Sequence, residues 1–262
     1  MLRRWGILLA MLTLTAGLTV AAGSASAATM GFRPGGPIHL VGTAAAAPNL
    51  RGGISHQAQS TNWSGYAATT GTYTSVSASW TEPTGTCSRG SQYSSFWVGL
   101  DGYSSGSVEQ TGSEVDCSGS RPQYYAWYEM YPNPSVSYSN TVRPGDQFHA
   151  SVTYTGGSNF SLFIQDSTQG WSHTTTGTLA NAARSSAEVI VEAPCCTASG
   201  GILPLADFNT VNITGSLANG SALGNAGGVT QIIMIDSAGR DKDTVSSLSG
   251  GENFSATWLR SN

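Results

Sequence analysis

The chain has 262 residues, of which only 11 are basic and 15 acidic, for a formal net charge of −4. Four of the 11 basic residues precede residue 59 and all 15 acidic residues follow residue 58, so the later part carries a net charge of −8. This charge excludes nucleic acid and anionic membranes as expected partners, because both repel an acidic protein. A chain with so few charged groups is also expected to tolerate acid, because few native ion pairs are lost on protonation.

The N-terminus has the three parts of a secretory signal. Two arginines at positions 3–4 precede an apolar run over residues 7–20, and residues 25–27 (Ala-Ser-Ala) match a small-residue cleavage pattern. The apolar run is too short for a stable membrane span. We therefore expect residues 1–27 to be a signal peptide, and the mature protein to be secreted to the extracellular space with no membrane partner.

Residues 28–58 differ in composition from the rest. They are rich in Gly, Pro and Ala and lack the alternation that begins near Asn62, which fits either a propeptide or a disordered leader. Arg33 and Arg51 could pair with carboxylates of the acidic domain and release them at low pH, so an inhibitory leader and an inert one both remain open. Residues 59–262 suit one domain with a substantial core.

Short alternating runs follow one another through residues 59–262. In residues 74–80, for example, Val76, Ala78 and Trp80 share one face, and residues 147–154 alternate in the same way. This period of two predicts strands. Residues 178–189 are the only helical candidate and are expected to hold one turn at most. Many short strands separated by turn residues indicate an antiparallel sandwich or barrel.

The run QYYAWYEMY over residues 123–131 is unusual. Its alternation places Tyr125, Trp127, Glu129 and Tyr131 on one face. Aromatic rings mixed with a carboxylate are typical of the floor of a binding cleft. The alternative is a strand in an aromatic core with Glu129 hydrogen-bonded to backbone, and the sequence does not decide between them.

Four cysteines follow the expected signal peptide. An exported protein favours disulfides over free thiols. We prefer a Cys87–Cys117 pair, which leaves Cys195 and Cys196 as a vicinal bridge or with separate partners. No spacing resembles a structural zinc site, and we expect no metal and no cofactor.

Most hydrolase chemistries find no support in residues 59–262. Only His149 and His173 are present, without a G-x-S-x-G or H-E-x-x-H motif, which argues against serine and metal hydrolases. The segment around Asp236 occurs once and is interpreted as a turn, not as half of an aspartic peptidase site. A glycosidase that uses Glu129 and Glu192 as its two carboxylates stays open.

Five segments occur in order: NWSGY (62–66), FWVGLDG (96–102), EQTG (109–112), AWYEMYP (126–132) and AEVIVE (187–192). Together they resemble the glutamic peptidases, or eqolisins, a family of secreted acid endopeptidases made with a propeptide. The resemblance spans roughly residues 61–258. It implies an all-β fold, an antiparallel β-sandwich of two sheets of the concanavalin-like or jelly-roll type.

The resemblance also implies the functional residues. Gln110 and Glu192 are the catalytic pair of the family pattern. Side chains assigned to substrate binding or to support of the site are Trp63, Trp97, Asp101, Trp127, Glu129 and Tyr131. Two residues of the predicted cleft differ from the family pattern. Tyr125 stands where an Asp is usual, and Met130 stands where a Trp is usual.

The expected reaction is hydrolysis of polypeptides at acid pH without a covalent intermediate. Ionised Glu192, with an ordinary pKa near ~4.3, takes a proton from water, and the Gln110 amide stabilises the oxyanion. This requires the Gln110 amide within hydrogen-bond reach of Glu192, directly or through one water. We expect a monomer. Two alternatives remain, a glycan-active hydrolase or lyase and a non-catalytic carbohydrate-binding sandwich.

Overall fold

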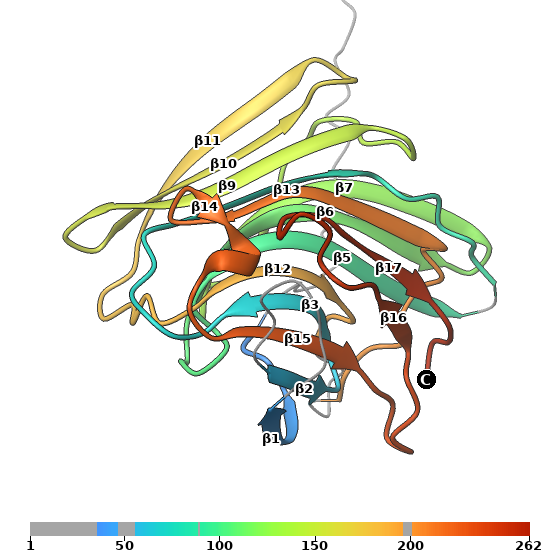
Figure 1. Cartoon of the computed structure of the whole chain (residues 1–262). Helices are drawn as coiled ribbons and strands as arrows, with labels where there is room; N and C mark the ends of the chain where they lie inside the picture. The colour runs from blue at the N-terminus through green and yellow to red at the C-terminus, as the bar shows by residue number, and fades with distance from the viewer. Residues whose placement is uncertain (1–35, 47–55, 89, 196–200) are drawn as a thin grey trace, which may run out of the picture. The chain divides into compact units, whose positions relative to one another are not determined.

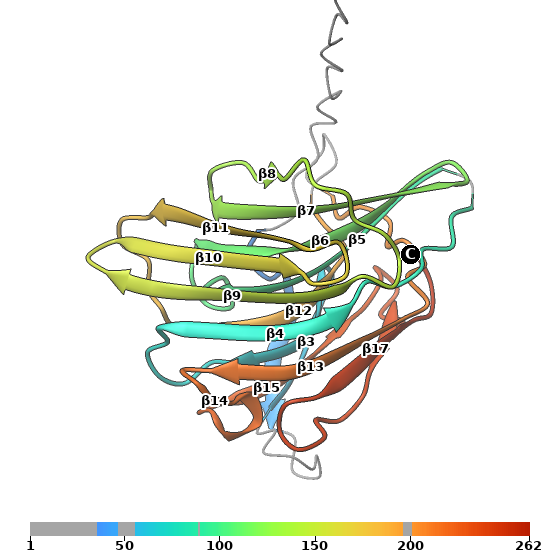
Figure 2. The same ribbon diagram turned by 90° about the horizontal axis from the view of Figure 1, so that it is seen from above.

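Two stacked β-sheets make up the fold (Figures 1 and 2). The computed structural model describes residues 36–46, 56–88, 90–195 and 201–262. The first sheet runs in the order β1 (Leu40–Ala46), β2 (His56–Ser60), β15 (Val229–Met234), β3 (Trp63–Ala68), β12 (Ala187–Glu192), β5 (Ser91–Leu100), β6 (Val108–Ser118), β7 (Arg121–Tyr131) and β8 (Val136–Ser137).

The second sheet runs in the order β11 (Trp171–Thr178), β10 (Asn159–Asp166), β9 (Gln147–Gly156), β4 (Ser75–Thr81), β13 (Thr210–Ala218), β17 (Phe254–Trp258) and β16 (Asp243–Val245), with β14 (Ser221–Ala222) paired to β13. The pairings of both sheets are antiparallel, except that β15 and β2 run parallel. A short 3-10 helix, Leu223–Asn225, follows β14. The predicted all-β sandwich of two sheets is therefore confirmed.

The main core lies between the two sheets. Val76, Ala78 and Trp80 of β4 are buried there, as their alternation predicts, and Trp80 stacks on Phe148 of β9 with ring centroids 5.6 Å apart. The segment 178–189 forms no helix, in agreement with the sequence. Every residue of β12 is buried, so the centre of the first sheet is covered on its outer face too. That second buried face explains why AEVIVE does not alternate simply.

Part of the expected leader belongs to the first sheet. Strand β1 pairs with β2, which pairs in parallel with β15, so residues 40–46 extend the edge of the sheet. Strand β2 begins at His56, three residues before the expected domain start. The signal peptide 1–27 and both leader arginines, Arg33 and Arg51, lie outside the described residues.

The predicted Cys87–Cys117 disulfide is confirmed. Cys195 is also disulfide-bonded, and Cys196 lies outside the described residues. Within the described part of the chain, no helix has the length and apolarity to cross a membrane.

Candidate active site

Three rows of side chains cross the outer face of the first sheet, the face turned away from the second sheet. From β3 to β7, the first row is Ala67, Glu188, Gly99, Gln110 and Glu129; the second is Gly65, Ile190, Trp97, Gly112 and Trp127; and the third is Trp63, Glu192, Ser95, Glu114 and Tyr125. Successive residues of a strand point to opposite faces, so all three rows share this outer face. The register therefore places both predicted catalytic residues on one surface.

Three tryptophans form a buried apolar layer on this face, called the tryptophan floor below. Trp63, Trp97 and Trp127 are almost fully buried and form a second apolar cluster with Val108 and Ile190. The rings of Trp63 and Trp97 meet edge to face, with centroids 4.9 Å apart. The indole N–H of Trp127 has no hydrogen-bond partner among the described residues, so it can donate to a bound carbonyl group.

Glycines make room for the Trp97 indole. A Cβ atom added at Gly99 would lie 2.8 Å from the Trp97 ring, and one added at Gly112 would lie 2.5 Å from Trp97 Cβ and 2.2 Å from Phe96 O. Backbone and ring cannot yield to such contacts without a shift of the sheet. These two positions of the FWVGLDG and EQTG segments must therefore lack a side chain.

Gln110 is held by its neighbour across the β6–β7 pair. Its Nε2 donates a hydrogen bond of 2.8 Å to Glu129 Oε2, and both side chains are buried. An amide group carries two N–H donors, so one N–H is left for another acceptor. Glu129 thus contacts the predicted catalytic amide directly.

Glu192, at the end of β12, is fully buried. Its Oε2 accepts a hydrogen bond of 2.9 Å from Trp97 Nε1, and its Oε1 lies 3.4 Å from the Asn62 Nδ2 donor. Burial raises the pKa of Glu192 to about 8, although these two donors act against the rise. The expectation of an ordinary pKa is therefore wrong for this state, because desolvation disfavours the ionised form.

Of the two expected contacts between Gln110 and Glu192, the direct hydrogen bond is not formed, and the contact through one water stays a prediction. Gln110 is on β6 in the first row and Glu192 on β12 in the third row, and Trp97 of β5 lies between them in the second row. Their hydrogen bonds go to Glu129 and to Trp97 instead. The structure brings the two to one face but not into direct contact.

Comparison with known proteins shows to which family the chain belongs. The family model described as the peptidase A4 family matches residues 61–258. The chain belongs to that family. Aspergillopepsin-2 from Aspergillus niger is 27% identical over 233 residues, which cover 79% of this chain and 80% of that protein. This chain is therefore an acid endopeptidase of the eqolisin type, as the sequence predicted.

Solved structures of the family agree with the fold. A crystal structure of scytalido-glutamic peptidase with a transition state analog inhibitor superposes with a TM-score of 0.66 at 24% identity, and covers 76% of this chain and 98% of its own. The structure of aspergilloglutamic peptidase from Aspergillus niger gives a TM-score of 0.56 at 27% identity, and covers 64% of this chain and 99% of its own.

The other predicted site residues have separate places in the peptidase. Tyr131 packs at the edge of the tryptophan floor. Asp101 is buried and accepts backbone N–H groups of Arg184 and Ser185, at 2.7 and 2.9 Å. These bonds hold the loop that leads into β12. Of the two roles considered for Asp101, support of the site fits this geometry.

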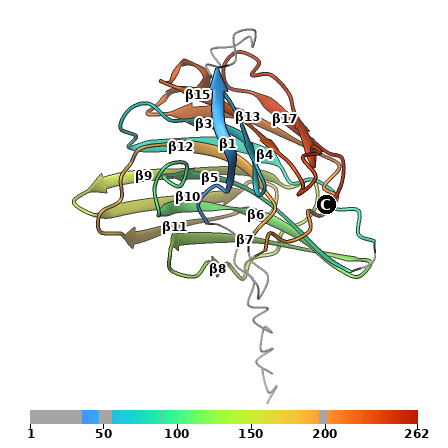
Figure 3. The same cartoon turned by 90° about the horizontal axis from the view of Figure 1, so that it is seen from below.

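Residues 36–38 of the expected leader lie against the same face, where Figure 3 shows the blue segment in front of the first sheet. Ile38 packs against the tryptophan cluster, and its N–H donates to Gly102 O at 3.1 Å. A Cβ atom at Gly36 would lie 3.7 Å from the Tyr131 ring. Residues 36–38 therefore cover part of the tryptophan cluster on this face.

Two further carboxyl groups of this face received no role from the sequence. Glu114 lies in the row of Glu192, and Asp116 follows it on the same face and accepts a hydrogen bond of 3.0 Å from Tyr125 Oη. Burial raises the pKa of both, and that of Asp116 reaches about 7. The i, i+2 spacing of the two acids, which places them on one face of a strand, was the available signal.

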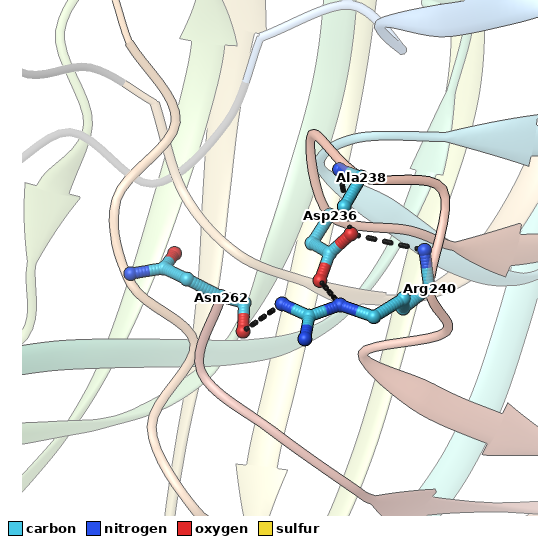
Figure 4. Close-up of polar contacts among 4 residues, drawn as sticks. All are labelled: Asp236, Ala238, Arg240 and Asn262. Carbon is cyan, nitrogen blue, oxygen red and sulfur yellow. Dashed lines mark hydrogen bonds and ion pairs between the residues drawn. The ribbon is translucent and has the colours of Figure 1, made fainter.

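Asp236 is a turn residue, as predicted. Its carboxylate accepts the N–H groups of Ala238 and Arg240 and pairs with Arg240 Nε at 2.7 Å (Figure 4). It takes no part in the cleft. Within the described ranges, no group of three or more His, Cys, Asp or Glu residues is placed to hold a metal ion.

Proposed function

We propose that this eqolisin is secreted as a precursor and hydrolyses polypeptides at acid pH with Gln110 and Glu192 as its catalytic pair. The observation that carries this proposal is their common position on the tryptophan-lined outer face, with Glu192 held by Trp97 Nε1. The reaction uses water as the nucleophile, needs no cofactor and is carried out by a monomer.

Each step has a group to perform it. Glu192, once ionised, takes a proton from water as the water oxygen bonds to the scissile carbonyl carbon. The second N–H of Gln110 donates to the oxyanion that forms. The C–N bond then breaks, and Glu192 passes its proton to the departing nitrogen. The bond from Gln110 to Glu129 keeps the amide oriented throughout.

The pKa of Glu192 links this reaction to the leader. With residues 36–39 in place, burial raises that pKa to about 8, so the group is protonated at acid pH and is not a base. Burial is the largest cause of the rise. Departure of the leader lets water reach the carboxyl, which lowers its pKa toward the ordinary value of about 4.3. The leader is thus an inhibitor in this proposal, and its removal activates the enzyme.

One assay separates this function from the alternatives. The exported protein, incubated at acid pH, is offered denatured casein and a panel of polysaccharides. Acid hydrolysis of casein alone is the expected result. Cleavage of a polysaccharide would support a glycan-active enzyme that uses Glu129 and Glu192, and retention of glycan without cleavage would support a binding protein.

A further inference from the structure

Asn62 has contacts that neither the sequence motifs nor the family pattern explains. It lies in the turn between β2 and β3, and its side chain is fully buried. The Ser60 hydroxyl donates to Asn62 Oδ1 at 2.9 Å, while Ser60 Oγ accepts the N–H groups of Asn62 and Trp63. These bonds fix which side of the amide carries the oxygen. Asn62 O also accepts the N–H of Ala193, next to Glu192, so the turn is tied to the end of β12.

The fixed amide touches a peptide backbone on both of its polar atoms. Asn62 Oδ1 accepts the N–H of His39 at 2.7 Å, and Asn62 Nδ2 lies 3.3 Å from Pro37 O. A donor and an acceptor of one side chain therefore bind one stretch of main chain, on either side of Ile38. Such a contact depends on backbone groups that every polypeptide has, and not on a particular side chain.

The same Nδ2 group lies 3.4 Å from Glu192 Oε1. One N–H bond vector can face the peptide carbonyl and the other the carboxyl group. We propose that Asn62 is a main-chain binding and positioning residue of the enzyme. It binds an extended substrate backbone as it binds residues 37–39, and it places that backbone beside Glu192. This inference rests on the proposed function for its catalytic part.

The charge of Glu192 depends on the same contact. A neutral donor stabilises the ionised carboxylate, and Asn62 is among the groups that lower its pKa. The titratable groups around Glu192 are Glu114, in the same row, and Asp116 and Tyr125 beyond it. These groups are acids, and no cationic side chain forms an ion pair with Glu192 among the described residues. Loss of the Asn62 donor therefore raises the pKa of Glu192, and the acid limb of kcat/KM moves to higher pH.

The test compares Asn62→Leu, which keeps the volume but removes both polar atoms, with Asn212→Leu on an exposed position of β13. Full chains are incubated at acid pH and assayed on labelled denatured casein from pH 2.5 to 6. For Asn62→Leu we expect a KM about tenfold higher, since a lost hydrogen bond of this kind is worth about 1.4 kcal/mol. The acid limb is expected to move up by about half a pH unit. Asn212→Leu is expected to match the wild type.

A second measurement does not depend on catalysis. Hydrogen exchange of the His39 amide in the uncleaved chain reports the main-chain contact itself, and Asn62→Leu is expected to accelerate it by about tenfold. An unchanged KM, acid limb and His39 exchange rate would overturn the inference, even if Asn62→Leu lowered the melting temperature. If the wild type failed to cleave casein while His39 exchange still depended on Asn62, the proposed function would be contradicted and the main-chain contact supported.

Discussion

The side-chain amide of Gln110 donates a hydrogen bond of 2.8 Å to Glu129 Oε2 across the β6–β7 pair. This bond orients the amide and leaves its second N–H for another acceptor, which in the proposed reaction is the oxyanion. Glu129→Leu removes the acceptor at similar size, and we expect kcat to fall by about tenfold because the amide is no longer oriented. Glu129→Gln keeps an acceptor oxygen and is expected to retain most of the activity. Equal, unchanged kcat values for the two variants would show that Glu129 does not position the amide.

Loss of the Gln110 amide is expected to lower kcat more than loss of the Glu129 acceptor that orients it. A single oxyanion donor is worth about 3–4 kcal/mol of the barrier. Gln110→Ala should therefore lose two to three decades of kcat, with KM changed little, because the bond forms only in the transition state. Steady-state kinetics on casein at acid pH measure both. A loss that appeared in KM alone would assign Gln110 to substrate binding.

Trp97 holds the carboxyl of Glu192 through its indole N–H. Trp97→Phe keeps an aromatic ring but removes this donor, so the ionised form of Glu192 loses stabilisation and its pKa rises. Because the base must be ionised, the acid limb of kcat/KM should move to higher pH, by about half a unit or more. The pH profile of the variant is the measurement. An acid limb that stayed in place or moved to lower pH would contradict the contact.

Stability should be greatest in acid. Burial raises the pKa of Glu82, between the sheets, to about 8, that of Glu109 to about 8 and that of Asp243 to about 7. A folded-state pKa above the unfolded one means that the native state binds more protons between about pH 4 and 8. The stabilisation is thus complete below about pH 4 and is lost progressively as pH rises from there through the folded pKa values of about 7 to 8. Burial lowers the pKa of Lys242 to about 8, so this group affects the pH dependence of the free energy of unfolding only above that pH.

Glu82→Gln isolates one of these groups. Its carboxyl accepts the hydroxyl hydrogen of Ser113, which an amide oxygen can also do, and it lies outside the cleft. Melting temperatures from pH 3 to 8 should fall less steeply in the variant. The difference should be on the order of 3 kcal/mol at pH 7. A wild-type melting temperature that increased from pH 4 to 7 would contradict this account.

The leader is expected to restrain the enzyme through Ile38, which packs on the tryptophan floor. Ile38→Asp places a charge there at neutral pH and is expected to expose the cleft, so that the precursor activates faster on a shift to acid. Leu40→Asp changes an exposed residue two positions later and serves as the control. Identical activation rates of the two variants would remove Ile38 from the restraint.

Strands such as β4, β9 and β10 could be predicted because they carry a period of two, as Val76, Ala78 and Trp80 show. Strand β1 could not, since LVGTAAA lacks that period and is placed by its pairing with β2. The common face of Gln110 and Glu192 depends on strand register, which the motifs supplied only through the family resemblance. The contacts of Asn62 could not be read from the sequence, because its partners lie 23 and 130 residues away. The raised pKa of Glu192 depends on its burial in the folded chain, which composition does not reveal.

The role of Glu192 as the catalytic base is tested by Glu192→Gln, assayed on denatured casein at acid pH after the same acid incubation as the wild type. The substitution keeps the shape of the side chain and one acceptor oxygen, but the amide cannot take a proton from water. Hydrolysis is expected to fall to the background of an enzyme-free control while the fold, checked by its melting temperature, is retained. Hydrolysis at the wild-type rate would contradict the assignment of Glu192 as the catalytic base.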